Sequence, residues 1–144
     1  MFKALSVIGY LAMVGGLIGL LVTRNILSPS PLVILPQIAA VALLIWARIT
    51  FGRRSFHAVA DPTAGGLVTT GPYRYIRHPI YTAVCVFVTT GAAAHPSGTT
   101  FILAGLVWSG AISRMLCEEH LVVARYPDYR EYAARTWRMV PFVF

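Results

Sequence analysis

The chain has 144 residues, of which 57% are hydrophobic and only 12% are charged. A soluble domain of this length would carry about a quarter charged residues. The composition therefore excludes an ordinary soluble domain and indicates an integral membrane protein. The net charge of +7 comes almost entirely from arginine. In a membrane protein such a surplus reflects topology and attraction to anionic headgroups, so we expect membrane lipid, and no nucleic acid, as a partner.

Four apolar segments follow one another along the chain. The first, 4–22, carries no charged residue and is long enough to cross a ~30 Å hydrocarbon core at ~1.5 Å per residue. It lacks the small-residue cleavage site of a signal peptide, so we interpret it as a retained span. The second segment is 32–47, and the third and fourth, 79–95 and 99–117, form a hairpin. We predict an all-α integral membrane protein with about four transmembrane helices.

The polar parts of the chain are the connection 48–77 and the tail 118–144. With both termini in the cytosol, these parts, Lys3 and Arg114 near the end of the fourth span place eleven of the twelve basic residues inside, and only Arg24 outside. The positive-inside rule therefore orients both termini toward the cytosol. We expect a single domain over 1–144, with the polar connection and the tail on one face of the membrane. The high ratio of arginine to lysine is typical of a GC-rich bacterium, which makes the bacterial inner membrane the expected location.

One stretch, GGLVTTGPYRYIRHPIY over 65–81, runs directly from the polar connection into the third span. Pro79 lacks an amide proton and has a fixed φ, so it suits the first turn of that helix. His78 then lies at the mouth of a membrane helix, where an ionisable residue is costly unless it has a polar role. No second histidine or acid lies three or four residues from His78, so we expect no metal site.

A second group of ionisable residues lies near the end of the fourth span. Arg114 and Glu118 are four residues apart and share a helix face, with Glu119 adjacent. A simple ion pair is one interpretation. The other combines this face with His78 and the tyrosines of the 65–81 stretch, because aromatic faces and a carboxylate can surround a bound cation while a guanidinium binds an anion.

The paired motifs G-P-Y-R-Y-I-R-H-P-I-Y over 71–81 and Glu118-Glu119 resemble the isoprenylcysteine carboxyl methyltransferase and phospholipid methyltransferase superfamily. Tyr129, Tyr132, Arg138 and Pro141 follow in the order of that family's tail. The resemblance implies an S-adenosylmethionine-dependent methyltransferase that acts on a membrane-borne or lipophilic acceptor, with the cytosolic loop and the tail forming the cofactor site.

When the family's functional residues are transferred to the matching positions of this sequence, the resemblance implies two sets of site residues. Arg114, facing the acceptor, and Glu118 would be catalytic. The cofactor pocket would be lined by Gly66, Leu67, Val68, Tyr73, His78, Ile80, Tyr81, Glu118 and Glu119. The resemblance does not decide whether the methyl group is accepted by a carboxylate, an amine headgroup or a thiol. Two alternatives are a membrane reductase with a nicotinamide site, since sterol reductases are similar in their C-terminal helical fold, and a non-enzymatic four-helix transporter or scaffold.

The charge asymmetry generates a prediction about topology. Reporter domains fused after Phe144 and inserted within 95–98 should report opposite sides of the membrane, with the C-terminal reporter in the cytosol. If both reporters lie on the same side, the third and fourth segments form a re-entrant hairpin rather than two spans.

Overall fold

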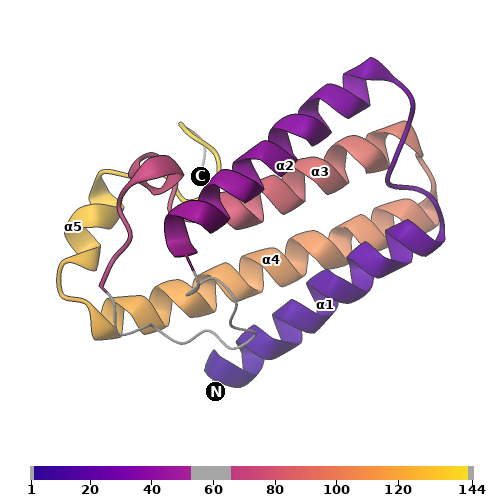
Figure 1. Cartoon of the computed structure of the whole chain (residues 1–144). Helices are drawn as coiled ribbons and strands as arrows, with labels where there is room; N and C mark the ends of the chain where they lie inside the picture. Colours follow the sequence, from indigo (N-terminus) through magenta and orange to yellow (C-terminus); the bar gives the residue numbers. More distant parts are fainter. Residues whose placement is uncertain (1, 53–65, 143–144) are drawn as a thin grey trace.

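The structure, a computed structural model, describes residues 2–52 and 66–142, and every regular element in these ranges is helical. Its four long helices are α1 (Phe2–Val22), α2 (Pro31–Phe51), α3 (Pro79–Ala94) and α4 (Gly98–Arg125), shown in Figure 1. A 3-10 turn, η2 (Gly71–Arg74), precedes α3, and the short helix α5 (Tyr129–Ala134) follows α4. The prediction of an all-α fold with about four long helices is confirmed. Part of the polar connection, including Arg53 and Arg54, lies outside the described residues.

Two helices extend beyond the apolar segments from which they were predicted. Helix α2 continues past residue 47 to Phe51, where Gly52 ends it with a φ of 69°. Helix α4 continues for two turns past residue 117 and ends at Arg125, two residues before Pro127. In both cases the hydropathy falls before the helix ends. Polar residues such as Glu118 are good helix formers, so each helix continues until Gly52 or the approach to Pro127 interrupts it.

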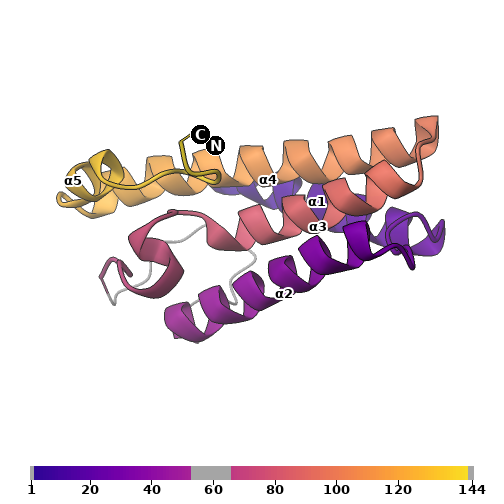
Figure 2. The same ribbon diagram turned by 90° about the horizontal axis from the view of Figure 1, so that it is seen from above.

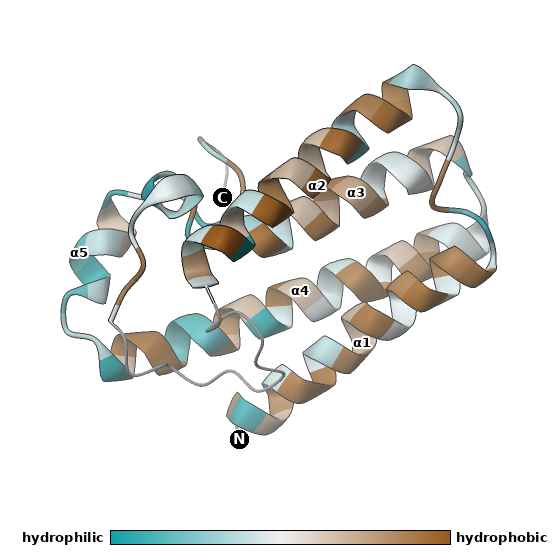
Figure 3. Cartoon of the chain, viewed as in Figure 1, coloured by the Kyte–Doolittle hydropathy of each residue, from teal (hydrophilic) through white to brown (hydrophobic). Residues whose placement is uncertain are grey.

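The helices have the length and the surface of membrane spans. Helices α1, α2 and α4 are each long and apolar enough to cross a bilayer, whereas α3, with 16 residues, is shorter. Large apolar side chains on α1 and α2 are exposed, including Ile8 and Leu32. Figure 3 shows the same division, with hydrophobic residues along the long helices and hydrophilic residues around α5. The chain is an integral membrane protein.

The helices pack as two pairs, α1 with α4 and α2 with α3, and the pairs meet along α3 and α4 (Figures 1 and 2). Two buried cores fill this contact. At one end the buried core joins Leu20 of α1 to Val88 and Ala92 of α3 and to Ala104 and Val107 of α4. A second core, next to the polar end of the bundle, contains Tyr81, Cys85, Ala111, Met115 and Met139.

Helix α1 lies so close to α4 that glycine is required at the contact. A Cβ atom on Gly16 would lie 2.7 Å from the carbonyl oxygen of Leu103. A Cβ atom on Gly110 would overlap the carbonyl oxygen of Gly9 and lie 2.7 Å from the amide nitrogen of Met13. Small residues allow membrane helices to gain close van der Waals contact without a hydrophobic driving force. The three glycines therefore fix the register of α1 against α4.

Away from the polar tail, Gln37 ties three segments together. Its side-chain amide, 5% exposed, donates to the carbonyl oxygens of Ile26 at 2.7 Å and Phe87 at 3.2 Å. A buried amide without partners would be costly inside the bilayer. Gln37 instead satisfies carbonyls of the α1–α2 loop and of α3, and so holds α2 against both.

The glycine contact generates a prediction with a matched control. Gly110→Ala should lower the stability of the detergent-solubilised protein by about 1–3 kcal/mol, because the added methyl group meets backbone atoms that no rotamer change can move. Gly105→Ala, on the same helix, meets no atom within 4 Å and should be neutral or slightly stabilising. Thermal unfolding of both variants is the measurement, and equal midpoints would contradict the close-contact interpretation.

Candidate functional site

The start of α3 is paired with the tail of the chain. The backbone amide of Arg77 donates to the carbonyl of Trp137 at 2.7 Å, and that of His78 donates to the carbonyl of Arg138 at 2.9 Å. Trp137 in turn donates to the carbonyl of Tyr75 at 3.0 Å, which completes a short parallel bridge. The hydroxyl of Thr82 donates to the carbonyl of Met139 at 2.8 Å, and Met139 is buried. These bonds hold residues 75–78 and the tail in fixed register.

Two basic side chains and His78 surround Glu119 on α4. The Nε atom of Arg77 lies 3.0 Å from Oε1 of Glu119, and the Nε atom of Arg138 lies 3.1 Å from Oε2. His78 Nε2 lies 3.3 Å from Oε1 of the same carboxylate. Glu119 therefore joins the R-H-P stretch at the start of α3 to the C-terminal tail.

Glu118 faces a different set of partners. Tyr81 of α3 donates its phenol proton to Oε1 of Glu118 at 2.6 Å. Arg114, one turn before Glu118, lies with Nε at 3.1 Å from the same oxygen and donates to the Tyr81 hydroxyl at 2.6 Å. His78 Nδ1 lies 4.0 Å from the second carboxylate oxygen. The i,i+4 ion pair that the sequence left as one interpretation is present, and Tyr81 is part of it.

We call these residues the carboxylate cluster: Arg77, His78, Tyr81, Arg114, Glu118, Glu119 and Arg138. The cluster holds three guanidinium groups and two carboxylates, so it carries a surplus positive charge before His78 is counted. His78 lies between the two carboxylates and contacts both. Such a group at the end of an apolar bundle is suited to an anionic ligand group, which a guanidinium binds through a planar fork of donors.

Arg77 also holds α5 in place. Its Nη1 atom donates to the carbonyl of Ala133 at 2.9 Å and to the carbonyl of Thr136. The last carbonyls of a helix have no partner within the helix, so a buried guanidinium at this position satisfies them. One side chain thus links Glu119 of α4 to the end of α5.

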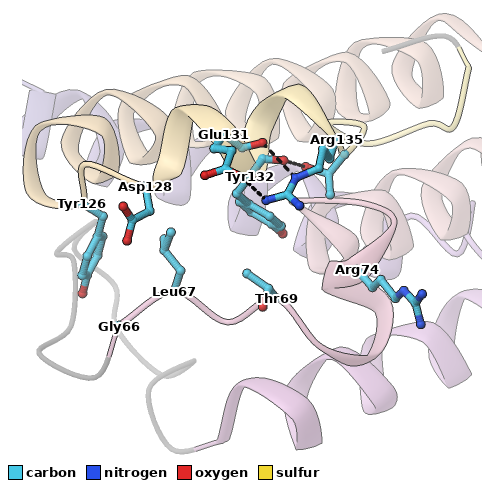
Figure 4. Close-up of a pocket in the computed structure, with 10 residues that line it drawn as sticks. Gly66, Leu67, Thr69, Arg74, Tyr126, Asp128, Glu131, Tyr132 and Arg135 are labelled. Carbon is cyan, nitrogen blue, oxygen red and sulfur yellow. Dashed lines mark hydrogen bonds and ion pairs between the residues drawn. The ribbon is translucent and has the colours of Figure 1, made fainter.

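A pocket of about 740 Å³ lies between the segment that enters η2 and the tail around α5. Figure 4 shows Leu67 and Thr69 on one side of it, with Tyr126, Asp128 and Glu131 on the other. Its remaining described lining residues are Gly66, Arg74, Tyr132, Arg135 and Thr136. Glu131 and Arg135 form an exposed ion pair at 2.8 Å. The volume is within the range, roughly 300–1,000 Å³, of pockets that bind small molecules.

Two tyrosines of α5 connect this pocket to its surroundings. The Tyr132 hydroxyl donates to the carbonyl of Tyr73 at 2.7 Å, and burial raises the pKa of Tyr132 to about 12. Tyr129 hydrogen-bonds Glu119, and burial likewise raises the pKa of Tyr129. Both phenols therefore stay protonated at neutral pH and act as donors. Tyr132 reaches toward η2, and Tyr129 toward the carboxylate cluster.

The predicted site residues fall into three groups in the structure. His78, Tyr81, Arg114, Glu118 and Glu119 meet in the carboxylate cluster, although the sequence separates them by about forty residues. Gly66 and Leu67 line the pocket. The others, Val68, Tyr73 and Ile80, belong to neither set of described residues. Tyr73 is buried, with its ring 5.4 Å from that of Phe51.

Arg77 and Arg138 were not among the predicted site residues, and neither were the lining residues Tyr126, Asp128, Glu131 and Tyr132. The signal for the arginines was present, because two adjacent glutamates at a membrane boundary need more positive partners than Arg114 alone. In the described parts of the chain no group of three histidine, cysteine, aspartate or glutamate side chains is arranged to hold a metal ion.

Comparison of the sequence with known protein families gives a match. Residues 32–124 match the isoprenylcysteine carboxyl methyltransferase family, and the chain belongs to that family. The matched region includes α2, α3 and nearly all of α4, and therefore His78, Tyr81, Arg114, Glu118 and Glu119. It includes neither α1 nor α5.

A curated relative is the nickel-cobalt-cadmium resistance protein NccN of Alcaligenes xylosoxydans xylosoxydans, which is 39% identical over 80 residues. The match covers 52% of this chain and 36% of the relative, so the chain spans only about a third of that protein. Comparison with solved structures gives no match.

The contacts of Arg77 generate a prediction about the tail. Arg77→Gln should destabilise the protein by about 3 kcal/mol, because it leaves Glu119 and the carbonyls at the end of α5 short of a buried partner. It should also loosen the tail, so that trypsin cleaves the native variant after Arg135 and Arg138 faster than it cleaves the parent. Arg135→Gln breaks only an exposed ion pair and should change stability by less than about 1 kcal/mol. Equal trypsin resistance of Arg77→Gln and the parent would contradict the proposed tail contact.

Proposed function

We propose that the protein is an S-adenosylmethionine-dependent methyltransferase that acts on a lipophilic acceptor in the membrane. One observation carries the proposal. Within the family-matched region, His78 and Tyr81 of α3 meet Arg114, Glu118 and Glu119 of α4 at the polar end of an apolar bundle, beside a pocket of small-molecule size. Polar residues that converge at one end of a membrane bundle indicate a ligand site rather than a structural role alone.

The chemistry of the described residues fits the donor. S-adenosylmethionine, when bound, supplies a methyl group carried on a positively charged sulfonium. Aromatic faces and carboxylates stabilise such a cation, and the pocket wall offers Tyr126, Tyr132, Asp128 and Glu131. The anionic end of an amino acid suits the surplus guanidinium charge of the carboxylate cluster. We assign donor binding to Gly66 and Leu67 in the pocket, and to His78, Tyr81, Glu118 and Glu119 in the cluster.

For the remaining predicted residues we propose supporting roles. Tyr73 holds the wall of the pocket through the bond that its carbonyl accepts from the Tyr132 hydroxyl. Val68 and Ile80, which adjoin Leu67 and Pro79 in the chain, would complete the donor site. We propose that Arg114 binds the acceptor, and a guanidinium group favours a carboxylate acceptor over an ammonium headgroup. Alignment of the two ligands and exclusion of water would then supply most of the rate acceleration.

The expected location follows from the same arrangement. Both the N-terminal end of α1 and the tail lie at the end of the bundle that carries the site (Figure 1). The basic residues gathered at that end favour the cytosolic side of a bacterial inner membrane, where the donor is dissolved.

Calorimetry in detergent tests donor binding. The parent protein, treated with chelator, should bind S-adenosylhomocysteine, and the chelator should not change the affinity. Glu118→Gln and Asp128→Asn should each weaken binding about ten-fold or more, since hydrogen bonds to charged groups contribute roughly 1.5–3 kcal/mol. Arg24→Gln, at the opposite end of the bundle, is the control and should bind as the parent does. Folded protein that shows no binding at millimolar ligand would overturn the proposal.

A further inference from the structure

Helix α1 precedes the region that matches the family, yet it reaches the carboxylate cluster. The glycine contact that fixes its register on α4 lies directly beside the site. A Cβ atom on Gly9 would lie 3.3 Å from the amide nitrogen of Arg114. The next residue, Tyr10, is consequently held at the height of the Arg114 side chain.

Tyr10 contacts the guanidinium group of Arg114. The Cζ atom of Arg114 lies 5.1 Å from the centroid of the Tyr10 ring, within the ~6 Å range of a cation–π interaction. The Nε atom of the same group is bound to the Tyr81 hydroxyl and lies 3.1 Å from Glu118. Arg114 is 6% exposed, so these contacts act in a desolvated environment where they are strong.

We propose that Tyr10 is a positioning residue, which holds the guanidinium of Arg114 against Tyr81 and Glu118 and makes α1 part of the site. The inference rests on the proposed function for its catalytic consequence, but the contact itself can be tested without turnover. Hydrogen bonds from Nε fix one edge of the guanidinium plane, and the ring fixes its face. Without the ring, the guanidinium plane could turn about the Cδ–Nε bond and lose its orientation toward a bound acceptor.

The first test is spectroscopic. In protein labelled with nitrogen-15 at arginine, the Nε–Hε signal of Arg114, assigned with Arg114→Lys, should be displaced by the ring current of Tyr10. Tyr10→Leu should move this signal, Tyr10→Phe should keep it near the parent position, and Leu11→Ala, an exposed neighbour on α1, should leave it unchanged. An Arg114 signal that is the same in Tyr10→Leu and the parent would overturn the proposal.

The second test separates positioning from structural support. With N-acetyl-S-farnesylcysteine as the acceptor probe, Tyr10→Leu should lower kcat/KM for the acceptor about ten-fold, as expected for loss of a desolvated cation–π contact. Its affinity for S-adenosylhomocysteine and its unfolding temperature should stay near those of the parent, and Tyr10→Phe should restore turnover. Equal losses of donor affinity, stability and turnover would reduce Tyr10 to a packing residue and contradict its positioning role.

The two tests fail in different ways. If the parent binds no donor and methylates no probe, the proposed function fails, and the spectroscopic result still decides whether Tyr10 holds Arg114. If the parent turns over but Tyr10→Leu matches it in both turnover and spectrum, the function stands and the role of Tyr10 is refuted.

Discussion

Two adjacent carboxylates near the end of a membrane helix impose the main constraint on this structure. Glu118 and Glu119 have side chains that are 27% and 12% exposed, and a carboxylate so placed is costly unless it is paired. Adjacent residues on a helix point about 100° apart, so each carboxylate has its own guanidinium partners, and His78 contacts both. Glu118 is paired within α4 and with α3, whereas Glu119 is paired with the start of α3 and with the tail.

This division explains how a short chain builds a site from distant segments. Helices α3 and α4 meet through a buried core that includes Cys85, Ala111 and Met115, and this core reaches the carboxylate cluster at Tyr81. Pairing of Glu119 with Arg77 and Arg138 then brings the tail back onto the start of α3. The tail supplies α5, which forms one wall of the pocket opposite Gly66 and Leu67. The carboxylate cluster therefore holds the wall of the pocket in place, although none of its residues is among the described residues that line the pocket.

Much of this arrangement could be predicted from the sequence. Uncharged stretches identify the long helices because backbone groups in lipid must be satisfied within a helix. Pro79 marks the start of α3, and the costs of His78 and Glu118 near the membrane indicate that they share a polar site. The end of α4 was less predictable, because hydropathy falls at Glu118 while the helix continues to Arg125.

Other features left no local pattern to detect. The parallel pairing of residues 75–78 with the tail uses backbone atoms, which carry no side-chain signature. Tyr10 lies in a span that is apolar on all sides, so only the packing of α1 on α4 shows which neighbour it contacts. Asp128 and Glu131 resemble ordinary surface acids until the fold places them opposite Leu67.

The most direct measurement is transfer of the methyl group itself. Purified protein would be incubated with methyl-labelled S-adenosylmethionine and a bacterial lipid extract, and the labelled product identified by mass spectrometry. Label should appear in a lipid-soluble molecule together with an equal amount of S-adenosylhomocysteine, and Glu118→Gln should reduce both. Folded parent protein that forms neither labelled lipid nor S-adenosylhomocysteine would contradict the assignment of this membrane site to methyl transfer.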